Sequence, residues 1–343
     1  MLIAALVAGC AGPTAGGAGR EPPAAPAAPE AAEPARAPAP APATATDQAG
    51  WQPHTAPGAA TLHNGFFLDD TRAWLISHQS GQVLRTVDSG ATWQIAAELG
   101  DGFLEMVHFV DAARGFLAGD RGRVLATSDG GTTWRAAGQF PADVAFYGLV
   151  FFAPEHGFAG GVDTAARRGR MFETRDGGRS WTDRSADISG FGFTDATVML
   201  GPGRALVGGL GVVYRTEDHG AGWQPIDIGA RGGVRGLFAG QRQVWAVGAK
   251  GLVARSSDHG QTWSPAAPFT DALLRSVMFV DEHEGFVAGD PNDEGISVWR
   301  TLDGGDTWQP DASITVGIHR LILGAGRLWA VGADGALLSR ALR

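Results

Sequence analysis

Short apolar runs separated by turn residues recur along the chain from Trp51 to the C-terminus. Two segments, 106–120 and 277–290, each contain an apolar run, an acidic turn and a second apolar run that ends in Ala-Gly-Asp. After the first of these, a third run covers residues 122–127 and a fourth begins near Trp134. Runs of this length between glycine and acidic residues are typical of β-strands joined by tight turns. The pattern therefore predicts a repeated unit of four antiparallel strands over roughly 42 residues.

A second pattern falls on the turn between the third and fourth strands of the unit and occurs six times. Each copy has Ser or Thr two residues before an aspartate, Gly two residues after it and Trp five residues after it. All but one copy have Thr or Ser just before the Trp, with Gly222 as the exception. The pairs are Asp88 and Trp93, Asp129 and Trp134, Asp176 and Trp181, Asp218 and Trp223, Asp258 and Trp263, and Asp303 and Trp308.

The aspartate turn is interpreted as structural. A carboxylate in this position accepts hydrogen bonds from backbone N–H groups of its own turn, and the following Gly tolerates a positive φ. The Trp on the next strand can bury on the order of 200 Å² between neighbouring units. We therefore expect none of the six aspartates to be catalytic.

The number of units follows from both ends of the repeat region. Residues 328–338 closely repeat residues 244–254, but the chain stops at Arg343, about where a seventh aspartate would fall. Trp51-Gln52-Pro53 repeats the Trp-Gln-Pro found at 223–225 and 308–310. An N-terminal strand that completes the last unit would close a ring and remove an exposed edge. We predict an all-β fold over residues 45–343, a seven-bladed β-propeller of four-stranded antiparallel blades whose last blade is closed by the N- and C-terminal strands.

Residues 1–44 have a different character. Residues 1–10 are apolar and end in Val7-Ala8-Gly9-Cys10, which resembles a bacterial lipobox, although no Lys or Arg precedes them. One interpretation is a lipoprotein signal remnant with Cys10 as the lipidation site; the other is a lone cysteine in a disordered apolar end. Residues 11–44 are almost wholly Ala, Pro, Gly and Thr, a composition that predicts a disordered tether. We expect a membrane-anchored lipoprotein with an extracytoplasmic propeller.

Composition and charge narrow the functional classes. The net charge is −9 and no long basic run occurs, which argues against a general nucleic-acid binder but leaves a local basic patch open. A single cysteine allows neither an internal disulfide nor a thiolate zinc site. The nine histidines show no metal-ligand spacing, and His219 and His259 merely follow box aspartates. We expect no metal, no cofactor and a monomer.

The complete repeat resembles a known family. Gly-Phe-x-Ala-Gly followed by Arg-Thr-x-Asp-Gly-Gly-x-Thr-Trp, clearest at 300–308, is similar to the Asp-box (BNR) propellers of the photosystem II stability and assembly factor family. The resemblance implies a non-enzymatic propeller that binds a newly made reaction-centre subunit through a basic face. We therefore expect a protein-binding propeller that serves as an assembly or stability factor for a membrane protein complex.

Two long loops are candidate partner-binding segments. Both connect a second strand to a third strand, which places them on the face opposite the aspartate boxes. One loop is basic (Arg167, Arg168 and Arg170), the other is acidic (Asp290, Asp293 and Glu294), and Arg121 and Arg123 extend the basic side. They are either ordinary solvated loops or the two poles of a partner-binding face.

The alternative function is a glycan-binding or sialidase-like glycoside hydrolase propeller. A sialidase needs three arginines, a tyrosine nucleophile and an acid/base pair. The chain has only Tyr147, on an inner strand that could face the channel, and Tyr214, which we expect to be packed. Asp120 and Asp290 end matching strands near the channel mouth and form either a carboxylate pair or two separate turn caps. We assign no catalytic residue.

Overall fold

The computed structural model describes residues 50–58, 61–188, 193–229, 232–311 and 313–342. The predicted lipidation site Cys10 and the predicted tether at 11–44 lie outside these residues, so both stay predictions. Within the described part of the chain, no helix has both the length and the apolar character needed to cross a membrane.

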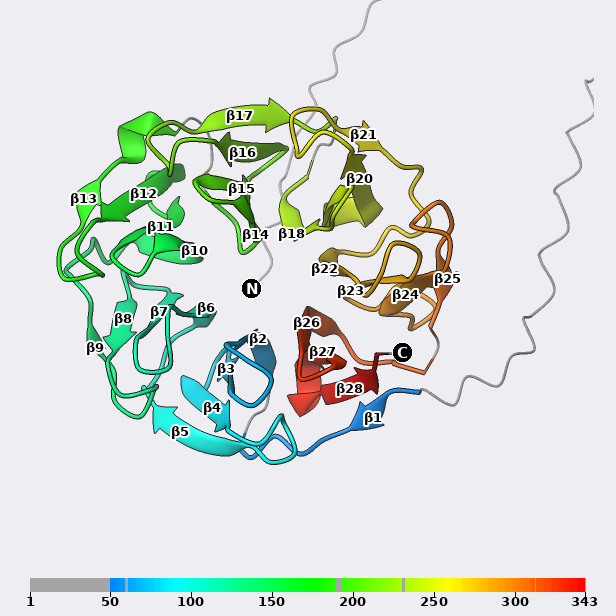
Figure 1. The fold of residues 1–343 in the computed structure, drawn as a ribbon, viewed down its shortest axis with the longest axis horizontal. Helices are drawn as coiled ribbons and strands as arrows, with labels where there is room; N and C mark the ends of the chain where they lie inside the picture. The colour runs from blue at the N-terminus through cyan, green and yellow to red at the C-terminus, as the bar shows by residue number, and fades with distance from the viewer. Residues whose placement is uncertain (1–49, 59–60, 189–192, 230–231, 312, 343) are drawn as a thin grey trace, which may run out of the picture. The chain divides into compact units, whose positions relative to one another are not determined.

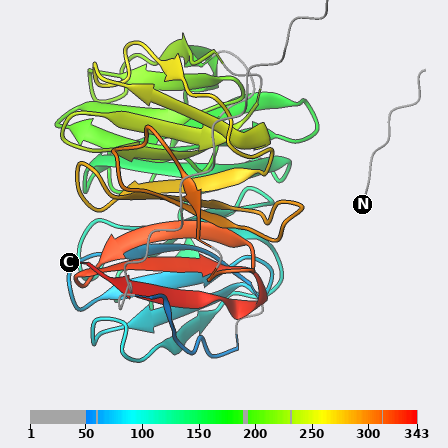
Figure 2. The ribbon, with the colours of Figure 1, turned by 90° about the vertical axis from the view of Figure 1, so that its right-hand side faces the viewer.

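The described residues from Gln52 onward form seven four-stranded antiparallel sheets around a central channel (Figure 1). Seen edge-on, the strands of each blade cross the thickness of the ring (Figure 2). In blades 1 to 6 the strands follow one another in chain order from the channel outward. The predicted seven-bladed all-β propeller is confirmed.

The strand bounds show how regular the repeat is. Blade 1 contains β2 (Leu62–Phe67), β3 (Ala73–Ser77), β4 (Gln82–Thr86) and β5 (Gln94–Glu98). Blade 2 contains β6 (Leu104–Phe109), β7 (Gly115–Gly119), β8 (Val124–Thr127) and β9 (Arg135–Ala136). Blade 3 contains β10 (Val144–Ala153), β11 (His156–Asp163), β12 (Arg168–Thr174) and β13 (Thr182–Asp183), followed by the short 3₁₀ helix η1 (Ser185–Asp187).

The remaining blades follow the same plan. Blade 4 contains β14 (Thr197–Gly201), β15 (Arg204–Gly208), β16 (Val212–Thr216) and β17 (Gln224–Asp227). Blade 5 contains β18 (Val234–Ala239), β19 (Val244–Gly248), η2 (Ala249–Gly251), β20 (Leu252–Ser256) and β21 (Ser264–Pro265). Blade 6 contains β22 (Leu274–Phe279), β23 (Gly285–Gly289), β24 (Val298–Thr301) and β25 (Gln309–Pro310). Blade 7 contains β26 (Ile318–Gly324), β27 (Arg327–Gly332), η3 (Ala333–Gly335), β28 (Leu337–Ala341) and the N-terminal β1 (Gln52–Pro53).

Each aspartate box closes its own turn through hydrogen bonds. In the first box, Asp88 accepts the backbone N–H of Thr92 at 2.9 Å and the Thr92 hydroxyl at 2.6 Å. The Thr86 hydroxyl donates to Asp88 at 2.7 Å and accepts the Gly90 N–H at 3.0 Å. The bonds from Thr92 and Thr86 lower the pKa of Asp88 to about 2. The carboxylate is therefore ionised at neutral pH, and both of its oxygens accept hydrogen bonds within the turn.

The glycine of each box lets the turn lie directly against the preceding blade. Gly90 has φ of 81°, and a Cβ there would stand 2.3 Å from the Trp329 indole of blade 7. The other five boxes meet the second strand of the preceding blade in the same way, through Gly131 on Trp74, Gly178 on Phe116, Gly220 on Phe158, Gly260 on Leu206, and Gly305 on Trp245. The turn thus joins two blades as well as two strands.

The joint between blades 6 and 7 is made by the N-terminal segment instead of a box. β1 pairs with β28, with Gln52 opposite Ser339. The Trp51 ring meets the edge of Phe286 in blade 6 at 5.9 Å, and its Nε1 donates to Asp311 at 3.0 Å. Trp223 likewise lies 5.9 Å from Phe158 of its preceding blade. Trp51 therefore takes the place of a seventh box tryptophan, as the Trp-Gln-Pro repeat indicated.

The fourth box allows a test of the hydrogen-bonded turn. Gly222 gives Asp218 its N–H at 2.9 Å but has no hydroxyl, and a Cβ added there would lie 3.4 Å from Asp218 Oδ2. We expect Gly222→Thr to raise the free energy of unfolding by about 1–2 kcal/mol, because it restricts the unfolded chain and supplies the missing bond. Denaturant unfolding of Gly222→Ala isolates the first contribution. Equal stabilisation by Ala and Thr would contradict the role of the hydroxyl.

Ring closure by Trp51 can be tested in the full chain. We expect Trp51→Ala to reduce stability by about 2 kcal/mol, since a half-buried indole and its hydrogen bond are lost. Trp51→Phe keeps a ring against Phe286 and should lose about 1 kcal/mol. Thermal unfolding measures both. An unchanged midpoint for Trp51→Ala would show that the N-terminal strand does not hold the ring closed.

Candidate functional site

Six of the seven inner strands carry a β-bulge at the same register. In each, the pairing with the second strand skips one residue at or near the end of that strand. The skipped residues are His63, Glu105, Tyr147, Arg235, Arg275 and His319. A bulge redirects the extra side chain and often occurs beside functional sites. The bulges of the inner strands thus place a ring of polar side chains at one end of the channel.

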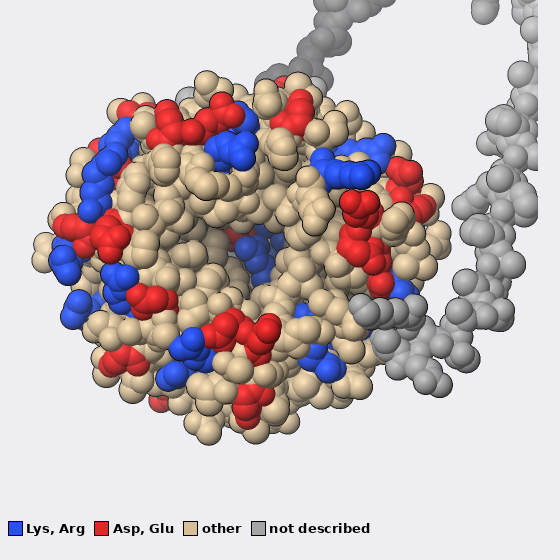
Figure 3. Space-filling model, viewed as in Figure 1, with Lys and Arg blue, Asp and Glu red and all other residues tan. Residues whose placement is uncertain are grey.

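Five of these bulge residues line a cavity of about 440 Å³, which we call the hollow. All but His319 lie in its wall, together with His78 and with Asp195 of blade 4. Thr164, Arg167 and Leu210, from loops between second and third strands, complete the rim. The hollow therefore opens on the face opposite the aspartate boxes. Figure 3 shows charged atoms inside the central hollow of the ring.

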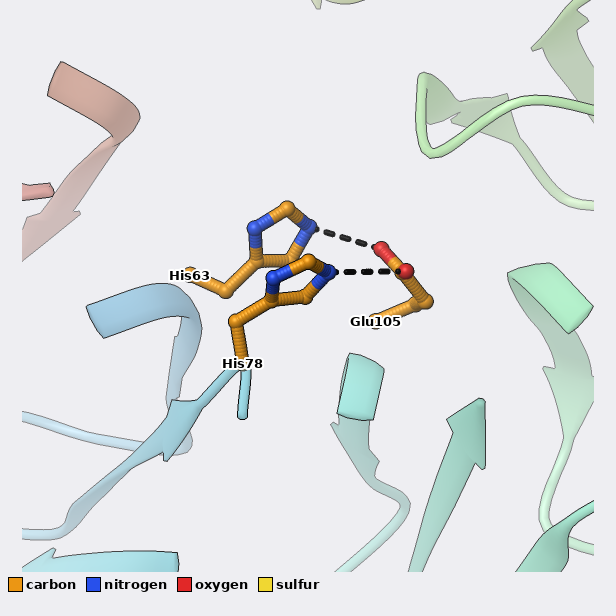
Figure 4. Close-up of side chains that lie close together, drawn as sticks. All are labelled: His63, His78 and Glu105. Carbon is orange, nitrogen blue, oxygen red and sulfur yellow. Dashed lines mark hydrogen bonds and ion pairs between the residues drawn. The ribbon is translucent and has the colours of Figure 1, made fainter. Parts of the chain in front are cut away.

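Two histidines and one carboxylate meet where blades 1 and 2 adjoin (Figure 4). His63 Nε2 lies 2.8 Å from one oxygen of Glu105, and His78 Nε2 lies 3.1 Å from the other. The two imidazoles stack, with ring centres 4.5 Å apart. Burial raises the pKa of Glu105, but the hydrogen bonds and charges of His63 and His78 outweigh it and lower that pKa to about 2. Glu105 is an ionised, buried carboxylate held by two rings.

The arginines of the hollow are held to different degrees. Arg275 pairs with Asp290 through both carboxylate oxygens, at 2.6 and 3.1 Å. Arg235 lies 3.7 Å from Asp195 and keeps 39% of its side chain exposed. The guanidinium of Arg320, on β26 of blade 7, donates to the main-chain oxygen of Asp195 in blade 4 at 3.2 Å. Arg320 therefore spans the channel between blades far apart in the sequence.

The predicted basic residues separate in the structure. Arg167 lies in the wall of the hollow, and Arg168 is exposed beside it. Arg170 is buried inside blade 3, where it donates to Asp183 at 2.7 Å, so it is not presented on the predicted face. Arg121 is exposed. The Arg123 guanidinium donates to the main-chain oxygens of Leu99 and Asp101, in the connection between blades 1 and 2.

The residues of the predicted acidic loop also differ in their environments. Asp290 orients Arg275, whereas Asp293 and Glu294 are exposed. Asp120 accepts the Phe103 N–H at 3.1 Å, whereas Asp290 accepts hydrogen bonds from Arg275, so the two carboxylates do not form a pair. Tyr214 is packed, and Tyr147 reaches the hollow. Whether the two loops form a bipolar partner-binding face stays a prediction.

The bulge ring is the feature that the sequence patterns did not reveal. His63, Glu105 and Tyr147 are 42 residues apart, and each follows a residue paired at or near the end of the second strand. The spacing was therefore present, but the residue type changes from blade to blade. His78 was missed because it follows Ser77 where blades 2 and 6 have Ala-Gly before the matching residue.

Comparisons with known proteins show the fold and little else. No family model and no curated protein sequence matches the chain. A structure of YCF48 bound to a D1 peptide is 18% identical, with a TM-score of 0.67, over 87% of this chain and 97% of that one. An ancestral GH74 enzyme is 13% identical, with a TM-score of 0.64, over 84% of this chain and 46% of that one.

A third neighbour is a catalytically inactive His→Ala variant of virginiamycin B lyase from Staphylococcus aureus, with quinupristin. It is 11% identical, with a TM-score of 0.68, over 86% of this chain and 99% of that one. Both binding proteins and enzymes therefore share this propeller fold, and identities this low do not distinguish between them.

The bond across the channel gives a prediction. We expect Arg320→Met to lower stability by about 1–3 kcal/mol, because it removes a cation near the buried Asp195 carboxylate. Asp195→Asn retains the main-chain acceptor and removes the charge, so the double variant should recover part of the loss. A double-mutant cycle by denaturant unfolding measures the coupling, with exposed Asp70→Asn as the additive control. Additivity for both pairs would contradict the coupling.

Proposed function

We propose that this protein is a non-enzymatic, extracytoplasmic, protein-binding propeller that receives an extended segment of a partner in the hollow. The single observation that carries the proposal is the ring of bulge residues, because five blades direct a polar bulge side chain into one cavity. A cavity of about 440 Å³ is within the range of ligand-binding pockets and would take a few residues of a peptide.

The rim suits a peptide with acidic and apolar residues. Arg167 is exposed, and Arg235 is partly exposed, at the wall of the hollow. Leu210 is 57% exposed on the rim, and Phe103, which stacks on His78, is 41% exposed. Guanidinium groups bind carboxylates with directed hydrogen bonds, and exposed apolar side chains beside them provide anchoring contacts.

The pKa values of Tyr147 and Glu105 in the hollow disfavour glycoside hydrolysis. Burial, and next the charge of Glu105, raise the pKa of Tyr147, so its phenol stays protonated rather than serving as a nucleophile. Glu105 has a pKa of about 2 and cannot donate a proton near neutral pH. Neither group therefore supplies the general acid that glycosidases need near neutral pH.

The setting of the partner is inferred from the N-terminus and from the neighbours. The predicted lipid anchor at Cys10 and tether at 11–44 would hold the propeller beside a membrane. The YCF48 structure with a D1 peptide supports a peptide ligand for this fold, in line with the resemblance to photosystem II assembly factors. We infer a membrane protein or complex as the partner and a role in its assembly or stability.

Affinity capture from detergent-solubilised membranes of the source organism tests the proposal with the full-length protein. We expect Arg235→Glu and Leu210→Asp each to reduce partner binding at least about tenfold, roughly 1.4 kcal/mol. The matched control is Arg242→Glu, an 81% exposed arginine in the turn between β18 and β19 on the box face. Cross-linking from position 210 should then identify the bound segment.

Two results would overturn the proposal. Equal capture by the wild type, Arg235→Glu and Leu210→Asp would show that the partner does not enter the hollow. Hydrolysis of any glycoside, lost in Tyr147→Phe or Glu105→Gln, would instead establish the glycosidase alternative.

A further inference from the structure

The side chains of His63, His78 and Glu105 form a compact group of metal-ligand type where blades 1 and 2 adjoin. One donor atom from each, two imidazole nitrogens and a carboxylate oxygen, lie within 4.8 Å of one another. All three side chains line the hollow. Figure 4 shows both rings directed toward the carboxylate from the same side.

We infer that these three residues bind a divalent first-row transition metal ion, with Zn²⁺ as the natural probe. Two imidazoles and one carboxylate are a recurrent ligand set for Zn²⁺ sites that keep an open coordination position. Tetrahedral bonds of about 2.1 Å separate ligand atoms by roughly 3.4 Å. The two histidines contact different oxygens of Glu105, at 2.8 and 3.1 Å, and one donor atom from each of the three residues lies within 4.8 Å of the others. Shifts of roughly 1 Å in these side chains would bring the donor atoms to tetrahedral separations.

The ligands are held in place by the fold. His63 and Glu105 are bulge residues of neighbouring inner strands, and each is only 9% exposed. The His78 ring lies between the rings of His63 and Phe103, at 4.5 Å from each. A site built on strands and packed rings loses little conformational entropy when it binds an ion.

A second buried histidine–glutamate pair shows what differs in this group. His156 lies 2.9 Å from Glu173, but Arg175 and Arg184 occupy that carboxylate, each at 2.6 Å. No arginine pairs with Glu105 among the described residues, so its charge is met by imidazoles alone.

The open coordination positions would face the hollow, since all three ligands lie in its wall. Water, or a carboxylate or imidazole from a bound molecule, would complete the coordination. The metal site does not depend on the proposed function and stands whether or not a protein segment enters the hollow.

Isothermal titration of metal-free, full-length protein with Zn²⁺ tests the inference. All variants carry Cys10→Ser and no histidine tag, so that neither a thiol nor a tag contributes ligands. We expect one equivalent to bind the parent protein, and His78→Ala and Glu105→Gln each to weaken binding at least about tenfold. His78→Ala is the main variant, because this side chain is 26% exposed and its loss disturbs the core least.

His156→Ala is the matched control, since it removes the other buried histidine–glutamate contact and should leave Zn²⁺ affinity unchanged. Thermal unfolding with and without Zn²⁺ gives a second readout: the ion should raise the midpoint of the parent and of His156→Ala, but not of His78→Ala. The absorption spectrum of the Co²⁺-loaded protein should report low-symmetry nitrogen and oxygen coordination that disappears in His78→Ala. Absence of a saturable equivalent, or equal binding by the parent and His78→Ala, would overturn the inference.

Discussion

The contact between an aspartate-box turn and the second strand of the preceding blade determines the spacing of the whole ring. The turn is closed by its own hydroxyl and carboxylate groups, so it keeps its shape without support from a neighbour. Its glycine has no Cβ, and this allows the backbone to lie against a large apolar side chain such as Trp329 or Trp74. Because the same joint occurs six times, each blade is placed on the next at nearly the same angle, and Trp51 makes the seventh joint.

These joints mainly involve the second strands and the box turns, and not the inner strands that line the channel. The second strands, such as β3 and β23, are buried at every position, and they supply the apolar core between blades. The residue skipped at each bulge is polar and lies outside the apolar clusters, although the residue before it, such as Leu62 or Leu104, is buried in them. Polar residues of different types can therefore occupy one register in different blades. The apolar core and the polar side chains of the hollow come from different parts of the same repeat.

The repeats made the fold predictable, but not the site. Six boxes, the partial match at 328–338 and the Trp-Gln-Pro at 51–53 were sufficient to predict seven blades and their closure. The direction of single side chains was not predictable in the same way. Arg170 falls in a basic segment, yet its place opposite Gly161 turns it toward Asp183 on the outer strand. A bulge also shifts the alternation by one residue, so sequence alternation alone could not place Glu105 or Arg235 in the channel.

The charges of the hollow are distributed unevenly around the ring. The arginine side chains Arg235 and Arg275 come from blades 5 and 6, whereas Glu105 of blade 2 contacts the stacked histidines of blade 1 on the other side of the channel. Asp290 of the acidic loop holds Arg275 and thereby sets the direction of one cation in the wall. Because Arg167 is exposed and Arg235 is partly exposed in the wall of the hollow, the anionic part of a bound molecule would meet blades 3 to 5 first. A ligand would consequently enter the hollow in a preferred orientation, with its other end toward the histidine-lined wall.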